Sequence, residues 1–187
     1  PQIDKPAGYS IRFSGAYEDQ QESFGKLIGL GLLIIFLVYV VMASQFESFS
    51  KPIIIMFTVP FALSGVILAL WMTGVSLDMI GALGIVLLVG IVVKNGIVLV
   101  DYINLMRERG HDLNEAIQIS GQSRMRPVLM TAFTTILGMV PMAVSQGEGA
   151  EMWRPLGIVV IGGLTVATFL TLYIVPVVYG AMSKKGE

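Results

Sequence analysis

Five stretches of the chain are apolar, nearly free of charge and long enough to cross a lipid bilayer. They span about residues 27–46, 52–73, 79–101, 127–147 and 155–181. An α-helix rises about 1.5 Å per residue, so about 20 residues cross a hydrocarbon core of about 30 Å. Backbone groups in lipid must be hydrogen-bonded within the protein, and the alternating segments of a transmembrane barrel are absent from this sequence. We therefore predict an all-α membrane protein, a bundle of five transmembrane helices.

The composition of the chain excludes several functional classes. Charged residues make up 13% of the sequence, against about 25% in soluble domains, which argues against a soluble bundle of buried helices. The chain has no cysteine and a single histidine, His111, so neither thiolates nor histidines can build a metal site. The net charge of −1 provides no strong field for nucleic acid. We find no nucleophile–base set, phosphate loop or metal-ligand cluster, and we expect neither enzyme activity nor a cofactor or bound metal.

Lysine and arginine in the short loops predict the orientation in the membrane. One side of the membrane holds seven of these residues, and the short loops of the other side hold only Arg154. The seven are Lys51, Arg107, Arg109, Arg124, Arg126, Lys184 and Lys185. This asymmetry places the C-terminus in the cytoplasm and the N-terminus outside. An external N-terminus without a signal peptide or an initiator Met leads us to expect a piece of a longer protein, with at least one upstream span.

Four segments outside the five runs have their own predicted structure. Residues 1–23 are expected to be the tail of an external domain, because apolar Tyr9, Ile11 and Phe13 alternate with polar residues as in a short strand. The following residues should lead helically into the first span. Residues 103–126 are expected to form a cytoplasmic loop with a short surface helix, since Asp112 and Glu115 have the spacing of a capping box. Residues 184–187 are the expected cytoplasmic tail.

Lys94 is the one charged residue in the interior of the five runs. A lysine at such depth costs about 2.5 to 3.5 kcal/mol, which makes a functional role the first hypothesis and snorkelling to the interface the alternative. A functional Lys94 needs a carboxylate partner, yet Asp101 lies seven residues along the helix, about 10 Å away in axial rise. The partner is therefore expected on a part of the protein outside this chain, or hydroxyls and carbonyls hold the ammonium. Asn95, beside Lys94, is expected to bond a neighbouring helix or to line the same polar path.

Small and hydroxyl side chains at helical spacing form further faces. The fourth run carries Thr131, Thr134, Thr135 and Gly138, and the second and third carry Ala62, Gly65, Ala69, Gly81, Gly84, Gly90 and Gly96. The alanines and glycines of the second and third runs predict close helix packing. Packing is equally an explanation for Thr134 and Thr135. Thr131 is the better candidate for a water-bearing polar path, because it follows Arg124 and Arg126 closely in sequence.

Four motifs in order resemble one family, the resistance–nodulation–division (RND) efflux pumps, in their hydrophobe/amphiphile branch. They are Ala-Ser-Gln-Phe-Glu-Ser-Phe at 43–49, Gly-Ile-Val-Val-Lys-Asn-Gly-Ile-Val-Leu-Val-Asp at 90–101, Arg-Met-Arg-Pro-Val-Leu-Met-Thr at 124–131 and Gly-Glu-Gly-Ala-Glu at 147–151. The resemblance covers about residues 8–180. It implies that the chain is the C-terminal transmembrane portion of a pump, the eighth to twelfth spans, and that residues 1–23 end the periplasmic porter domain.

The resemblance also implies a function and partners. Such pumps are homotrimers in the bacterial inner membrane that import protons to export drugs or other amphiphiles, with a periplasmic adaptor and an outer-membrane channel. Lys94, Arg124 and Thr131 match the lysine, arginine and threonine of the family's proton relay, and we add Asn95 as their neighbour. The aspartates of the relay have no counterpart here and are expected on a span in the remaining N-terminal part of the pump.

Three alternatives stay open beside this proton/drug antiporter. A relative could export metal ions or lipids. A non-transporting membrane module could serve in assembly, sensing or protein translocation. A passive channel is disfavoured, because it needs polar residues along several spans and only the fourth run offers a clear stripe.

Overall fold

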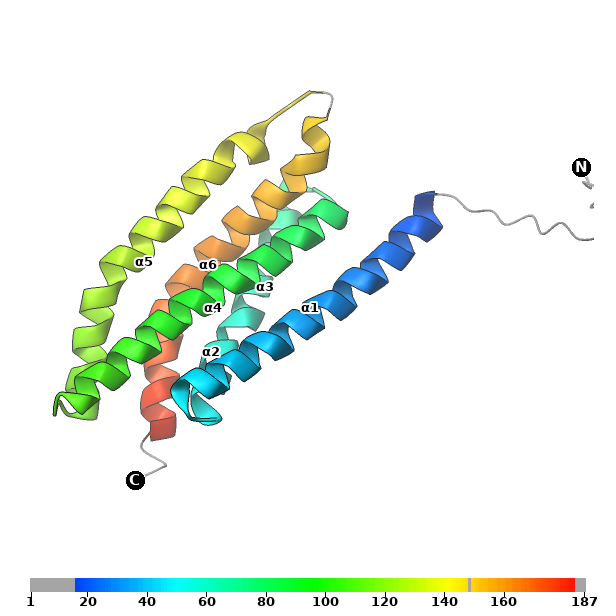
Figure 1. The fold of residues 1–187 in the computed structure, drawn as a ribbon. Coiled ribbons are helices and arrows are strands. Elements are labelled where there is room, and N and C mark those ends of the chain that lie inside the picture. Colours follow the sequence, from blue (N-terminus) through cyan, green and yellow to red (C-terminus); the bar gives the residue numbers. More distant parts are fainter. Residues whose placement is uncertain (1–15, 148, 184–187) are drawn as a thin grey trace, which may run out of the picture.

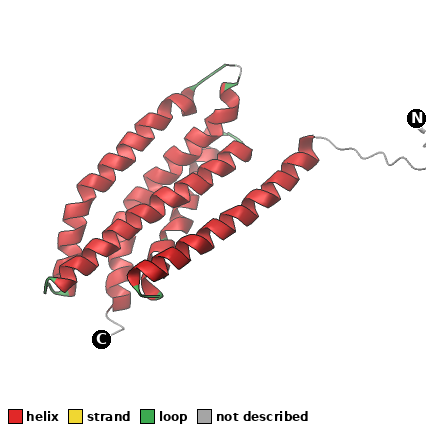
Figure 2. Cartoon of the chain, in the orientation of Figure 1, coloured by secondary structure: helices red, strands yellow, loops and turns green. Residues whose placement is uncertain are grey.

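The computed structural model describes residues 16–147 and 149–183, and these residues form helices joined by short turns (Figures 1 and 2). The helices are α1 (Ala16–Phe46), α2 (Ser50–Met56), α3 (Thr58–Thr73), α4 (Met79–Glu108), α5 (Leu113–Val144) and α6 (Ala150–Ser183). Five segments are long and apolar enough to cross a membrane: Ser23–Phe46, Ser50–Thr73, Met79–Glu108, Leu113–Val144 and Ala150–Met182. The predicted all-α bundle of five spans is confirmed. The strand expected around Tyr9, Ile11 and Phe13 and the tail at 184–187 lie outside the described residues.

Helix α6 lies at the centre of the bundle and packs along α3, α4 and α5 (Figure 1). Its inner face is apolar, with Val159, Leu164 and Ala167 buried against side chains of the neighbouring helices. By contrast, α1 contacts only α2 and α4 among the described helices, and side chains such as Phe36 remain exposed along it. The apolar surface of α1 is consistent with a helix that faces lipid or another part of the protein.

Glycines let α6 approach its neighbours closely. A Cβ on Gly65 of α3 would lie 2.7 Å from the carbonyl oxygen of Gly162, and one on Gly162 would lie 2.9 Å from that of Gly65. A Cβ on Gly84 of α4 would lie 2.9 Å from Leu156 Cδ1. These contacts confirm the predicted close packing at Gly65 and Gly84. Gly90, in the same predicted set, has nothing within 4 Å of its Cβ position and is exposed.

The second span, predicted at 52–73 with a kink at Pro60, is divided at Phe57 into α2 and α3. Pro60 explains the division, because it has no N–H to donate to the carbonyl of Met56 one turn earlier. The Thr58 hydroxyl donates to the Ile55 carbonyl at 2.6 Å and supplies a bond within the break. Hydropathy located this span correctly, but only the backbone shows that two helices build it.

The expected loop at 103–126 is mostly helix in the structure, which corrects the sequence-based boundary. Helix α4 continues to Glu108, α5 begins at Leu113, and α5 runs on through Pro127 into the fourth span. Hydropathy marks where lipid begins, whereas a helix can extend beyond the lipid as long as its backbone bonds continue. Asp112 is the N-cap residue but its side chain makes no capping bond; instead Glu115 lies 3.1 Å from His111 Nδ1. A separate surface helix is therefore absent from the described residues.

The glycine contact between α3 and α6 predicts the effect of one methyl group. A Cβ in Gly162→Ala would collide with Ala69 Cβ and crowd the Gly65 carbonyl. Overpacking of this kind destabilises a protein by about 1 to 3 kcal/mol, so we expect a lower midpoint of thermal unfolding in detergent. Gly121→Ala is the matched control, because nothing lies within 4 Å of its Cβ position. Equal midpoints for the two variants would contradict the close contact.

Candidate functional site

One face of α4 is left uncovered by the other described helices, and Lys94 lies on it. The exposed residues follow one another at intervals of three, four or seven: Leu83, Leu87, Gly90, Lys94, Asp101, Leu105 and Glu108. This spacing is that of a single helical face. The opposite face is buried, with Leu88, Val92 and Leu99 in the core. The structure therefore presents Lys94 outward, with the uncharged part of the stripe on one side of it and Asp101 on the other.

Lys94 and Asp101 share this face, as their spacing predicted, but they do not pair. The two residues are two helical turns apart, and no ion pair joins either of them to a charged group within 16–147 and 149–183. Asn95 is half-buried beside Lys94. The exposed ammonium is thus positioned to meet whatever covers this face of α4.

The threonines of α5 form an exposed polar stripe. Thr131 and Thr134 are exposed and Thr135 is half-buried. The Thr131 hydroxyl donates to the carbonyls of Pro127 at 2.8 Å and Val128 at 3.0 Å, and the Thr135 hydroxyl donates to the Thr131 carbonyl at 2.8 Å. These bonds lie within α5, so the hydroxyls do not tie it to a second described helix. Their oxygens keep lone pairs that can accept a bond from water or from an ammonium.

Arg124 is anchored to α4 through an aromatic ring. Its guanidinium carbon lies 4.4 Å from the ring centroid of Tyr102, the residue that follows Asp101. A cation over an aromatic face is attracted by the ring quadrupole. The Nε atom of Arg124 is buried and makes no hydrogen bond, and the same holds for the Ser120 hydroxyl one turn earlier. Buried polar atoms therefore lie between the C-terminal part of α4 and the N-terminal part of α5. We predict that these ends of the two helices face the cytoplasm.

The structure distributes the predicted relay residues over two helices that pack together. Lys94 and Asn95 are on α4, and Arg124 and Thr131 are on α5, with contacts between the two helices. No hydrogen bond or ion pair in the described part of the chain joins one of the four to another. The link between the helices at this end is Tyr102, which sequence reasoning missed. Tyr102 and Arg124 are 22 residues apart, so no local spacing signals their contact.

The Tyr102–Arg124 contact can be tested with a double-mutant cycle. We expect Tyr102→Leu and Arg124→Gln to be coupled by about 0.5 to 1 kcal/mol in the free energy of unfolding, because each removes one side of the same cation–π contact. Tyr102→Phe should retain most of the coupling, since the ring face is kept. The measurement is unfolding of the purified protein in detergent. Additive effects of the two substitutions would show that the stacking contributes nothing.

A family model and individual relatives place the chain in the same family of proteins. The model of the AcrB/AcrD/AcrF family matches residues 1–183. The chain is 40% identical over 186 residues to the cobalt-zinc-cadmium resistance protein CzcA of Cupriavidus metallidurans (strain ATCC 43123 / DSM 2839 / NBRC 102507 / CH34). It is 40% identical to the cation efflux system protein CzcA of Alcaligenes sp. (strain CT14) as well. Each alignment covers 100% of this chain and 18% of the relative, so the chain spans under a fifth of their length.

Solved structures agree with the sequence relatives. The crystal structure of a heavy metal efflux pump in crystal form II superposes with a TM-score of 0.83 at 34% identity, over 91% of this chain and 17% of that one. Crystal form I gives a TM-score of 0.81 at 35% identity, with 91% and 17% covered. A family model over nearly the whole chain and relatives at 40% identity confirm the resemblance found in the motifs. The chain belongs to the AcrB/AcrD/AcrF family, within the RND efflux pumps, and is the C-terminal transmembrane portion of such a pump.

Proposed function

We propose that this chain is the C-terminal transmembrane part of a proton-driven exporter of divalent metal ions, and that Lys94 couples proton entry to movement of the helices. The observation that carries the proposal is the position of Lys94. It is the one charge in the interior of five apolar spans, and it lies exposed on the uncovered face of α4. An ammonium kept there at a cost of about 2.5 to 3.5 kcal/mol is more readily explained by function than by packing.

The coupling step follows from the electrostatics of an ion pair away from water. A helix that covers the exposed face of α4 and carries a carboxylate would pair with Lys94, because opposite charges attract strongly at low dielectric. When a proton neutralises the carboxylate, the ammonium loses its partner and must find other oxygen acceptors. Breaking one side of such a pair is strongly unfavourable. The arrangement of α4 that suits the charged acid therefore no longer suits the neutral one.

Polar groups on α5 support a route for the proton. Arg124 lies at the predicted cytoplasmic end, and Thr131 lies seven residues further along α5, about 10 Å deeper by helical rise. Thr131 and Thr134 are exposed and lie three residues apart on one face of α5. We propose that Arg124, Thr131 and Asn95 hold waters that lead to Lys94 and its partner acid.

The names of the relatives favour metal ions over drugs as the exported substrate. The two sequence relatives are a cobalt-zinc-cadmium resistance protein and a cation efflux protein, and the structural relative is a heavy metal efflux pump. The metal-exporting alternative thus fits better than the drug and amphiphile exporter that the motifs first indicated. Among the described residues, no three His, Cys, Asp or Glu side chains lie close enough together to hold a metal ion. The proposed substrate class therefore rests on the relatives.

The wider setting of the transporter is part of the same proposal. We expect it in the bacterial inner membrane with the N-terminus of this chain in the periplasm and the C-terminus in the cytoplasm. It would work as a homotrimer with a periplasmic adaptor and an outer-membrane channel. The partner acid of Lys94 would lie on a span in the remaining N-terminal part of the pump.

Lys94→Met in the complete transporter tests the coupling role. We expect loss of metal-ion efflux with normal trimer assembly, because methionine keeps an unbranched side chain only one atom shorter and removes the charge. Leu87→Met is the matched control: it places the same residue two turns earlier on the same exposed face, and leucine and methionine have similar volumes. The measurement is proton-driven metal uptake into inverted vesicles. Full transport by Lys94→Met would contradict the proposal.

The substrate class is tested separately in cells. A strain that depends on this transporter should tolerate cobalt, zinc or cadmium salts and lose that tolerance when the gene is deleted. Its sensitivity to lipophilic dyes and detergents should not change. The reverse pattern would favour the amphiphile exporter while leaving the role of Lys94 intact, and unchanged sensitivity to both would favour a non-transporting module.

A further inference from the structure

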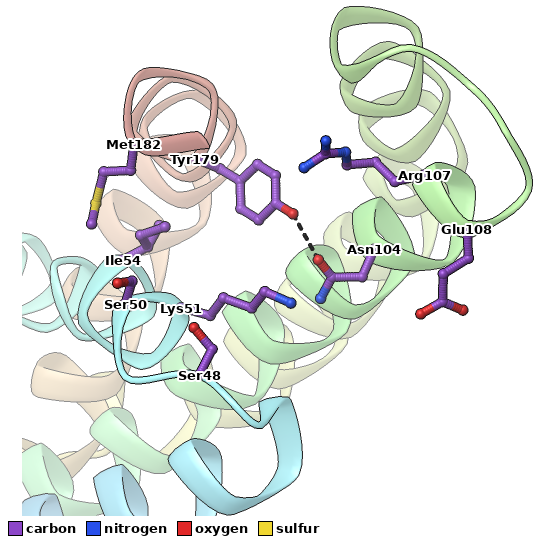
Figure 3. Close-up of a pocket in the computed structure, with 9 residues that line it drawn as sticks. All are labelled: Ser48, Ser50, Lys51, Ile54, Asn104, Arg107, Glu108, Tyr179 and Met182. Atoms are coloured by element: carbon purple, nitrogen blue, oxygen red, sulfur yellow. Dashed lines mark hydrogen bonds between the residues drawn. The ribbon is translucent and has the colours of Figure 1, made fainter. Parts of the chain in front are cut away.

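A pocket of about 320 Å³, lined by polar and apolar side chains, lies where the turn between α1 and α2 meets the C-terminal ends of α4 and α6 (Figure 3). Three separate parts of the chain build it. Ser48, Ser50 and Lys51 come from the turn and the start of α2, Asn104 and Arg107 come from α4, and Tyr179 comes from α6. This end of the bundle is the one we predict to face the cytoplasm. The relay residues Lys94, Asn95, Arg124 and Thr131 do not line the pocket.

The side chains of the pocket present mainly hydrogen-bond donors. Tyr179, which is buried, donates its hydroxyl proton to Asn104 Oδ1 at 2.7 Å and thereby joins α6 to α4. Asn104 also carries an NH₂ group, which adds two N–H donors beside this bond. Lys51 and Arg107 add cationic donors, and the serines add hydroxyls. Such a set suits a ligand with several anionic oxygens.

The lining of the pocket contains two basic residues and one acidic residue. Lys51 is half-buried, and the ammonium has no ion-pair partner within the described residues. Glu108 is the one acid in the lining, and Figure 3 shows its carboxylate directed away from Arg107 and Tyr179. Lys51 and Arg107 place two cationic side chains in the lining, which favours an anionic ligand over a metal cation.

Exposed apolar side chains adjoin the pocket. Phe49, between the two pocket serines, is 77% exposed, and Ile53, on the first turns of α2, is 47% exposed. Ile54 and Met182 add apolar surface to the lining itself. A ligand with a charged head and an apolar tail would therefore find both kinds of surface within one short segment of the chain.

We infer that this pocket binds the phosphate of an anionic phospholipid, with the acyl chains against the exposed side chains of α2. Basic pockets between membrane helices on the cytoplasmic side commonly bind lipid headgroups. Phosphate as a free ion has the same oxygen chemistry, but it would not use the apolar surface beside Phe49 and Ile53. The site is independent of proton transport, so it does not rest on the proposed role of Lys94.

Lipid binding by the intact transporter in detergent tests the site. The probe is phosphatidylglycerol, counted by native mass spectrometry, with zwitterionic phosphatidylcholine as the reference. Lys51→Gln and Arg107→Gln should each weaken retention of phosphatidylglycerol about fivefold, from the contribution of one basic residue near a lipid surface. Glu108→Gln should strengthen it, because the substitution removes the opposing charge. Lys51→Arg should retain binding, since the positive charge is kept.

Arg109→Gln is the matched control, because Arg109 is exposed, lies two residues beyond Arg107 and does not line the pocket. It should leave binding unchanged. Equal losses in Arg109→Gln and Lys51→Gln would show attraction by overall charge only and would overturn the site. If millimolar inorganic phosphate fully displaces phosphatidylglycerol, the pocket binds phosphate as a free ion, and the proposal that its ligand is a lipid is wrong. If neither single variant, Lys51→Gln or Glu108→Gln, changes the binding of phosphatidylglycerol, the proposed lipid site is wrong. That result would say nothing about transport.

Discussion

The close backbone contact between α3 and α6 is the interaction on which the rest of the bundle depends. Lipid tails are as apolar as the helices, so the hydrophobic effect does not press the spans together, and van der Waals contact at short range must do so. Gly65 and Gly162 allow that contact, because a Cβ on either would lie within 3 Å of the other's carbonyl oxygen. Helix α6 also packs on α4 and α5, so its position sets theirs.

Helix α4 carries both polar sites that this packing leaves accessible. Its buried face holds residues such as Leu88 and Val92, while Lys94 is on the uncovered face and Asn104 lines the pocket at the end of the bundle. Ten residues, or about 15 Å of helical rise, separate Lys94 from Asn104. The two sites therefore share one helix, although the proposed lipid site does not depend on the proposed role of Lys94.

Prediction from sequence succeeded where the signal was local and failed where it was not. The five spans, the packing at Gly65 and Gly84, and the shared face of Lys94 and Asp101 followed from hydropathy and helical spacing. The separation of a surface helix from the fourth span was wrong, because hydropathy reports contact with lipid rather than the extent of a helix. The contact of Tyr102 with Arg124 and the bond from Tyr179 to Asn104 join residues 22 and 75 positions apart, beyond any periodic pattern.

The sequence by itself predicted that the chain crosses a membrane as helices, because backbone groups in lipid must be hydrogen-bonded internally and the alternating segments of a barrel are absent. It also singled out Lys94, since charge is costly at that depth and the surrounding residues are apolar. Only the tertiary structure decided which face of α4 stays open and which donors gather around Lys51. Both depend on how helices distant in sequence pack against α4 and α6, and that packing is set by three-dimensional shape rather than by spacing along the chain.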